Sequence, residues 1–215
     1  RTTSDLSREE KQTLLSAIVE LLVSKGFKGS KALELIGTVY TLTKEPAGSP
    51  TRDAREFSSM LNACGRMDRQ GLAVSICVGE RGPILDEVQE VVASYRKTLA
   101  EYMEWITGTP SAIMELNTVC VVRGEDKIAE NMTGAFSSIL SSAGHLKPNK
   151  ATIVGARSRD GGVKVSARAP EVLLKKGVDL GLALQKASAA FGGFGGGHNV
   201  AAGAHIRSAN AEELY

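Results

Sequence analysis

The chain has 215 residues, of which 42% are hydrophobic and 23% charged, and its formal net charge is +2. This length suits one large or two small domains with a buried core, and the composition is that of an ordinary globular protein. No apolar stretch approaches the roughly 20 residues of a membrane span, and no signal peptide is visible. The three cysteines, Cys64, Cys77 and Cys120, lack metal-ligand spacing. We therefore expect reduced thiols in a cytoplasmic protein.

The first part of the chain predicts helices. Ser7-Arg8-Glu9-Glu10 is a capping box, and it opens a helix that Gly26 ends. A second helix is expected from Ser30 to about Leu42, followed by a loop over residues 46–50.

A third helix is expected over about Thr51 to Arg66, with an apolar and a polar face. The apolar face should pack inward, whereas a polar face is most often simply solvated. Here only Glu56 supplies an acid nearby, which favours a polar ligand over bulk water. The apolar face holds Ala54, Phe57, Leu61 and Cys64, and the polar face holds Arg55, Ser59, Asn62 and Arg66.

A long helix is predicted from Ile84 to Ile106, because its apolar residues step by alternating three and four positions. Such a stripe fits a coiled-coil dimer, but a single helix that spans two lobes fits better. Gly108, Thr109 and Pro110 end it. We expect an α/β protein with a helical segment over 1–82, a connecting helix over 83–107 and an α/β domain on a small mixed sheet over 111–215.

The predicted elements of this last domain alternate between strands and helices. Asp160-Gly161-Gly162 should be a tight turn between two paired strands, and Asp179 should cap the last helix. The strands are expected at Leu116–Arg123, Ala151–Arg157, Gly162–Arg168 and Val200–Ile206, and the helices at Ile128–Ala143, Pro170–Gly177 and Leu180–Ala190.

Two segments near the C-terminus suggest an anion site. In the strand Gly162–Arg168, Lys164, Ser166 and Arg168 share one face. The run Gly192–Gly197 precedes His198, and glycine lets backbone amides approach an anion closely. A flexible loop and a solvated strand are the alternative interpretations. However, residues 146–207 hold ten Lys/Arg and three Asp/Glu, a local charge of +7, so the rest of the chain sums to −5. Such a basic region favours a polyanionic ligand.

Several common motifs are absent from the sequence. The glycines follow a predicted helix, so they form no dinucleotide fingerprint, and no Gly-Lys-Ser/Thr ends them as in a P-loop. His145, His198 and His205 have no partners at metal-ligand spacing. The basic domain has few of the acids that hold metals in phosphodiester hydrolysis, so we expect no metal and no catalytic residue in this chain.

Four segments together resemble the RecJ family of DHH phosphoesterases, and its archaeal branch with the GINS-associated nuclease in particular. They are Leu61-Asn62-Ala63-Cys64-Gly65-Arg66-Met67, the long helix, Val165-Ser166-Ala167-Arg168 and Gly195-Gly196-Gly197-His198. The resemblance runs over essentially the whole chain.

The resemblance implies a two-lobed enzyme whose Asp-His-His lobe holds Mn²⁺ or Mg²⁺ and whose DHH-associated domain binds the substrate. The chain contains no Asp-His-His, so we expect the catalytic lobe to be absent and the parent protein to be the hydrolase. The expected phosphate-binding residues are Arg157, Lys164, Ser166, Arg168, Gly195, Gly196, Gly197 and His198, and Arg55, Asn62 and Arg66 should face the cleft.

The leading hypothesis is the nucleic-acid-binding part of a single-strand exonuclease. If Arg157, Lys164 and Arg168 each neutralise a phosphate, the salt slope of binding should be about −2. The alternatives are a non-catalytic replication scaffold that docks the GINS complex, and a phosphodiesterase for cyclic dinucleotides or very short RNA. The C-terminal domain of alanyl-tRNA synthetase is a further relative, against which the Asn-Ala-x-Gly-Arg segment argues.

Overall fold

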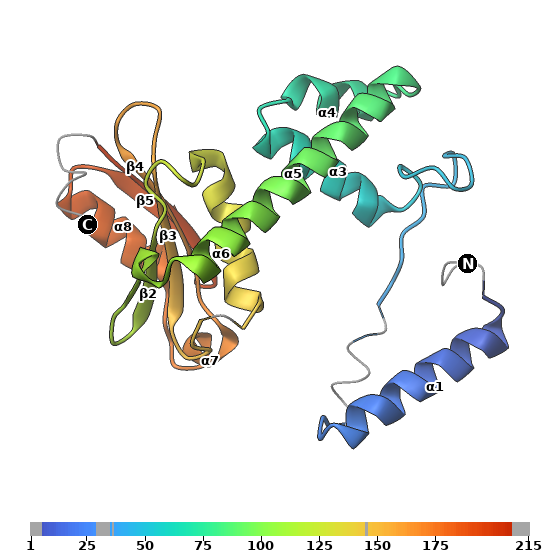
Figure 1. Cartoon of the computed structure of the whole chain (residues 1–215), viewed down its shortest axis with the longest axis horizontal. Helices are drawn as coiled ribbons and strands as arrows, with labels where there is room; N and C mark the ends of the chain where they lie inside the picture. Colours follow the sequence, from blue (N-terminus) through green and yellow to red (C-terminus); the bar gives the residue numbers. More distant parts are fainter. Residues whose placement is uncertain (1–5, 29–34, 36, 145, 208–215) are drawn as a thin grey trace. The chain divides into compact units, whose positions relative to one another are not determined.

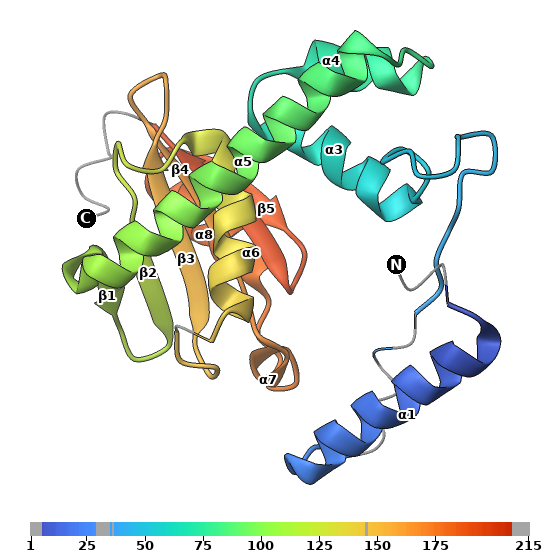
Figure 2. The same ribbon diagram turned by 45° about the vertical axis from the view of Figure 1, so that its right-hand side comes forward.

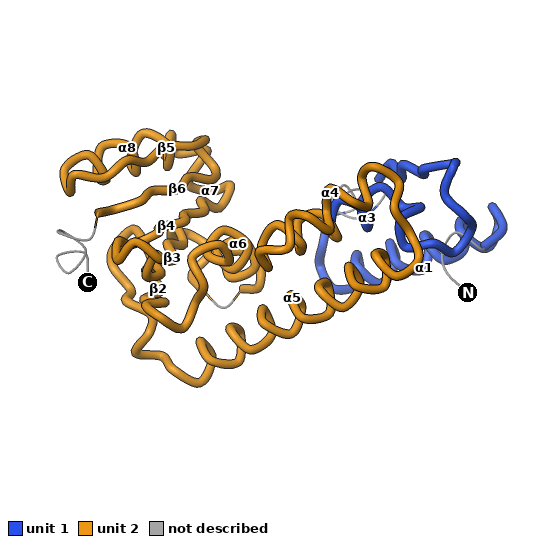
Figure 3. Tube along the Cα trace, turned by 90° about the horizontal axis from the view of Figure 1, so that it is seen from above, with its two compact units in different colours: residues 1–59 blue, residues 60–215 orange. Residues whose placement is uncertain are grey.

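The computed structural model describes residues 6–28, 35, 37–144 and 146–207. The chain forms two compact units, Arg1–Ser59 and Met60–Tyr215 (Figure 3). No helix among the described residues is both long enough and apolar enough to cross a membrane.

The first unit begins with α1, Arg8–Ser24, and its capping box is confirmed. The Glu10 backbone N–H donates to Ser7 Oγ (3.2 Å), and the Ser7 N–H donates to the Glu10 carboxylate (2.8 Å). Gly26, with φ of +85°, follows the helix end as predicted.

The helix predicted from Ser30 to Leu42 is wrong over its last six residues. Residues 37–42 are not helical, and Thr41 forms a β-bridge with Asp53. Their β-branched and aromatic side chains disfavour a helix. The earlier residues of that prediction, 30–34 and 36, lie outside the described part of the chain.

Three helices follow, of which α4 was not predicted (Figure 1). The Asp53 carboxylate starts α3 by accepting from the N–H groups of Arg55 and Glu56. The buried residues of α3 are Met60, Ala63 and Cys64, so only Cys64 of the predicted apolar face is fully buried. The three helices are α3, Ala54–Arg66; α4, Gln70–Cys77; and α5, Pro83–Gly108.

The long helix α5 belongs to the same unit as the sheet. Its N-terminal half packs on α4, and its C-terminal half packs on the sheet domain, where Ile106 is buried. The predicted stripe is thus divided between two sets of neighbours.

The sheet has six strands in the order β1-β2-β3-β4-β6-β5, and only β2 and β3 are parallel neighbours. This confirms the expected α/β class with a mixed sheet. The strands are β1, Ile113–Glu115; β2, Val119–Arg123; β3, Ala151–Arg157; β4, Val163–Arg168; β5, Phe194–Gly197; and β6, Ala201–Ile206. The helical segments are η2, Pro110–Ala112; η3, Glu130–Met132; α6, Thr133–Ser142; α7, Glu171–Leu174; and α8, Leu180–Ala190.

Helices cover parts of both faces of the sheet (Figures 1 and 2). On one face α6 packs on β3 and β4, where Phe136 and Leu140 join Val154 in the main core. On the other face α8 packs on β5 and β6, and Leu180 lies in a second core. Asp179 caps α8 as predicted, by accepting from the Leu182 N–H (3.0 Å).

One strand prediction was wrong in part, and one strand was not predicted. The segment Leu116–Arg123 is not one strand, because residues 116–118 turn the chain between β1 and β2. No strand was predicted in the glycine run, but Phe194–Gly197 pairs with β6 as the edge strand β5. The glycines of β5 have no side chains to pack, so backbone hydrogen bonds to β6 keep them in the sheet.

Candidate functional site

The register of β4, β6 and β5 aligns the predicted residues in rows across one face of the sheet. Ser166 lies opposite Gly203, which lies opposite Gly196. The next row pairs Arg168 with Ala201, and the row on the other side joins Lys164, His205 and Phe194. Residues that face each other in antiparallel strands point to the same side, so the three rows form one surface. This is the face on which α6 covers β3 and β4 (Figure 2).

Gly196 and Gly203 form the middle of this surface, and we call them the glycine floor. No atom lies within 4 Å of where a Cβ on Gly196 would be, and a Cβ on Gly203 would come no closer than 3.4 Å to the Val165 carbonyl oxygen. Backbone is therefore open to a ligand at these two residues.

The flanking glycines of β5 face the other side, where they allow close packing. A Cβ on Gly195 would lie 2.8 Å from Ser188 Oγ in α8. A Cβ on Gly197 would lie 2.6 Å from the Ala201 carbonyl oxygen. Gly195 and Gly197 therefore serve the fold, and among the glycines of β5 only Gly196 opens onto the face that holds Ser166.

Arg168 is held at the end of β4 by three hydrogen bonds. Its Nε donates to Ser138 Oγ (2.8 Å), and its Nη2 donates to the Gly134 carbonyl oxygen (3.1 Å). Its Nη1 donates to the Ala167 carbonyl oxygen (2.8 Å). Because a guanidinium has five N–H donors, one N–H remains on each Nη atom for a ligand.

Arg66 reaches the same place from α3. Its Nη1 donates to the Asn131 carbonyl oxygen (2.8 Å). A Cβ placed on Gly134 would lie 3.5 Å from Arg66 Nη1 and 3.7 Å from Ser166 Oγ. Arg66, Ser166 and Arg168 therefore converge around Gly134, although they come from segments that are far apart in the sequence.

Arg66 and Arg168, which we call the arginine pair, are not neutralised by acids. Burial, and after it the positive charge of Arg66, lower the pKa of the Arg168 guanidinium. Among the described residues, no ion pair joins either arginine to a carboxylate. Two like charges held together without an acid make a site that favours an anion.

Ser166 is buried next to the arginine pair and joins β4 to α6. Only 6% of the residue is exposed, and its hydroxyl lies 2.9 Å from Thr133 Oγ1. Thr133 donates its single hydroxyl proton to the Glu130 carbonyl oxygen (2.9 Å). Ser166 must therefore be the donor to Thr133, which ties β4 to the start of α6.

His198 lies just beyond β5 and is exposed. Its backbone N–H donates to the Ala201 carbonyl oxygen (2.8 Å), which extends the β5–β6 pairing by one residue pair. His198 thus stands in the row of Arg168, two strands away, or about 10 Å at the usual strand spacing.

The structure separates Arg157 from the other predicted residues. Arg157 lies opposite Val163, whose side chain packs on the α8 face, so Arg157 belongs to that other face. Its guanidinium is also paired with Asp126 (3.0 Å). On α3, Asn62 is exposed one turn before Arg66, and Arg55 lies in the first unit.

The α6 residues of the site were not predicted, because no role was assigned to the polar residues of that helix. Gly134 supplies a carbonyl oxygen, Ser138 a hydroxyl and Thr133 a buried hydroxyl. The one available signal was the polar content of that helix, where Thr133, Ser137 and Ser138 interrupt the apolar spacing.

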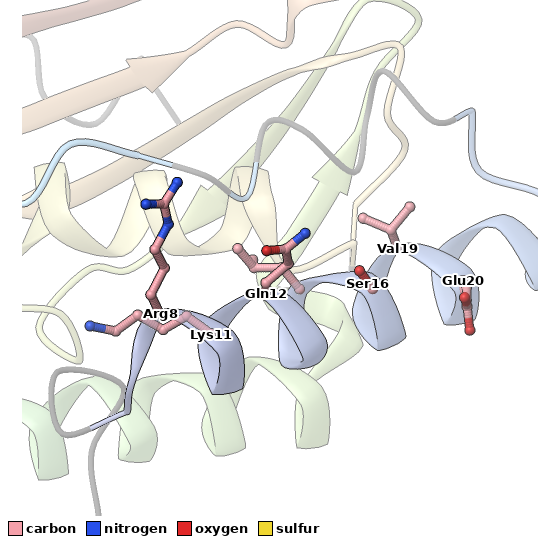
Figure 4. Close-up of a pocket in the computed structure, with 7 residues that line it drawn as sticks. Arg8, Lys11, Gln12, Ser16, Val19 and Glu20 are labelled. Carbon is pink, nitrogen blue, oxygen red and sulfur yellow. The ribbon is translucent and has the colours of Figure 1, made fainter.

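No cluster of three or more His, Cys, Asp or Glu that could hold a metal ion occurs within the described ranges. A shallow hollow runs along α1 in the first unit (Figure 4). One helix face forms it, so it has no opposing wall and supports no ligand assignment. It is lined by Arg8, Lys11, Gln12, Leu15, Ser16, Val19 and Glu20.

Residues 117–215 match the DHHA1 domain. The chain is 29% identical over 209 residues to an uncharacterized protein of Methanocaldococcus jannaschii, MJ0831, and the match covers 97% of this chain and 41% of that protein. The chain therefore spans less than half the length of this relative.

The fold is also similar to that of RecJ from Thermus thermophilus. The structure solved with Mn²⁺ matches with a TM-score of 0.57 at 18% identity, over 95% of this chain and 27% of that one. The structure solved with Mg²⁺ gives a TM-score of 0.56 at 18% identity, over 95% and 29%. At this level of identity the likeness to RecJ shows a shared fold, and the DHHA1 match applies to residues 117–215.

Proposed function

We propose that this chain binds single-stranded nucleic acid by its phosphodiester backbone, as the substrate-binding part of a RecJ-like, metal-dependent exonuclease. The observation that carries the proposal is the arginine pair, two guanidiniums without acids beside a floor of open backbone. The DHHA1 match and the similarity to RecJ support the choice of substrate class.

In this proposal one phosphate lies beside Gly134 and accepts from the free N–H groups of Arg168 and from Arg66. The next phosphates lie along the sheet, where Lys164 and His198 occupy the rows on either side of the glycine floor. Ser166, whose hydroxyl is committed to Thr133, positions β4 against α6. Asn62 lies on the same helix face as Arg66, one turn away, and extends the contact.

Metal-dependent hydrolysis of a phosphodiester needs residues that hold the metal ions. The expected Mn²⁺ or Mg²⁺ requires a cluster of carboxylates and imidazoles, and none occurs in the part of the chain that the structure describes. The proposal for this chain concerns binding alone.

The test is the salt dependence of binding to a fluorescent single strand, such as oligo(dT). The phosphate shared by Arg66 and Arg168 and the phosphate beside Lys164 should together give a slope of about −1.4 in log K against log salt. Lys164→Gln, which removes one of these two contacts, should lower the magnitude by about 0.7. Arg157→Gln is the matched control and should leave the slope unchanged. A wild-type slope near zero would contradict the proposal.

A substrate of only a few nucleotides is a second candidate. The open surface extends over three rows, or about 14 Å along β5 and its continuation to His198, which is room for about two phosphates. Competition between a dinucleotide and a long oligonucleotide separates the two. Equal affinity per molecule would favour the short substrate, and a large preference for the long strand would favour the exonuclease.

A further inference from the structure

Phe194 exposes an aromatic ring on the same surface as the glycine floor. It is the first residue of β5 and is 67% exposed. Gly195 faces α8, so Phe194 points to the other side, where Gly196 also lies.

The Phe194 ring is braced from the neighbouring strand. It stacks on His205, with ring centroids 5.4 Å apart and an interplanar angle of 26°. His205 Nε2 lies 3.1–3.2 Å from the carboxylate oxygens of Asp160, which also accepts from the Gly162 N–H (3.0 Å). The imidazole is therefore fixed, and one face of the phenyl ring rests on it while much of the ring stays exposed.

The Phe194 ring also lies within one nucleotide's length of the glycine floor. Phe194 and Gly196 are two residues apart on one strand, or about 6.8 Å. One sugar joins the base of a nucleotide to its phosphate, so a single nucleotide can touch both places. Lys164 lies in the same row as Phe194 and places a positive charge on this side.

We propose that Phe194 is a stacking platform for a nucleobase whose phosphate lies on the glycine floor. This inference rests on the function proposed above, and it adds a base contact to a site otherwise built for the backbone. The positive charge of Lys164, in the same row two strands away, favours a nucleotide over an apolar protein segment. Every base has an aromatic face, so the platform would add affinity without strict sequence selection.

The experiment compares two oligomers of equal length, oligo(dT) and the same backbone made of abasic residues. Phe194→Leu keeps an apolar side chain but removes the ring. It should weaken binding of oligo(dT) roughly 5- to 150-fold and leave binding of the abasic oligomer unchanged. Phe194→Trp should retain the affinity for oligo(dT).

A fluorescence readout reports on stacking directly. The fluorescence of 2-aminopurine in a single strand should be quenched on binding to the wild type and less so on binding to Phe194→Leu. Leu182→Ala is the matched control, because Leu182 is 55% exposed on α8 at the other face, and it should change neither readout. Melting temperatures of all variants establish that they fold.

The outcomes separate the two proposals. If the wild type binds neither oligomer, the proposed function fails. If it binds both and Phe194→Leu weakens neither, or weakens both equally, the backbone function stands and the stacking platform is wrong.

Discussion

Arg66 and Arg168 hold two positive charges side by side around Gly134, and the charge of Arg66 adds to burial in lowering the pKa of Arg168. Folding thus keeps an unfavourable pair of like charges together, and a bound anion would relieve it.

We expect Arg66→Gln and Arg168→Gln each to weaken single-strand binding by about 1.5–3 kcal/mol, the usual value of a hydrogen bond to a charged group. If both arginines bind one phosphate, the double variant should lose less than the sum, with a coupling of about 0.5–3 kcal/mol. Fluorescence anisotropy at fixed salt measures the cycle. Simple additivity would mean that the two arginines bind separate phosphates.

Gly203→Ala should affect binding and Gly195→Ala should affect stability, because the added methyl groups point to opposite faces of the sheet. At Gly203 the methyl has room and should change stability by less than about 0.5 kcal/mol. It would project from the glycine floor and should weaken binding. At Gly195 it would strike Ser188 and should cost about 1–3 kcal/mol of unfolding free energy. Urea unfolding and binding titrations on both variants check this. If Gly203→Ala bound the single strand as tightly as the wild type does, the glycine floor would not be a contact with the ligand.

Thr133→Val should destabilise the fold more than Ser166→Ala. The valine would leave the buried Ser166 hydroxyl without its acceptor, at a cost of about 1–3 kcal/mol. The alanine leaves Thr133 still donating to Glu130, so its cost should be smaller. Urea denaturation of both variants gives the comparison, and the reverse order would show that Ser166 is not the donor.

Glu115 should make the fold sensitive to acid. Hydrogen bonds from Lys147 and then Lys150 lower the pKa of its carboxyl group from 4.5 to about 2. Since the folded-state pKa is the lower one, the stabilisation is complete above about pH 5 and is lost as the pH falls toward 2. We expect Glu115→Gln to melt below the wild type at pH 7 and the difference to disappear near pH 2. A constant difference across this range would contradict the ion pairs.

Local sequence signals predicted most of the C-terminal domain. The strand Ala151–Arg157 and the helix Leu180–Ala190 have the predicted bounds, because strand alternation, a turn and an Asp cap act over a few residues. The edge strand β5 was missed because glycine carries no strand preference, and its pairing depends on β6. The helix α4 was missed for a related reason, since it is short and its burial depends on α5.

The candidate site was predicted in part. Ser166 and Arg168 follow from strand alternation, and the register does align them with the glycines and His198. The position of Arg66 beside Arg168 depends on tertiary packing between α3 and α6, which no spacing within either segment reveals. The suggested partnership with GINS and the division of the chain at residues 82 and 107 stay predictions.

The three hydrogen bonds of Arg168 also bear on how tightly a ligand can be held. A free arginine side chain loses rotamer entropy worth about 1.5–2 kcal/mol when it is immobilised. In this domain Ser138, Gly134 and Ala167 already impose that order during folding. An anion that arrives at this guanidinium therefore meets a side chain that has little freedom left to lose, and more of the interaction remains available as affinity.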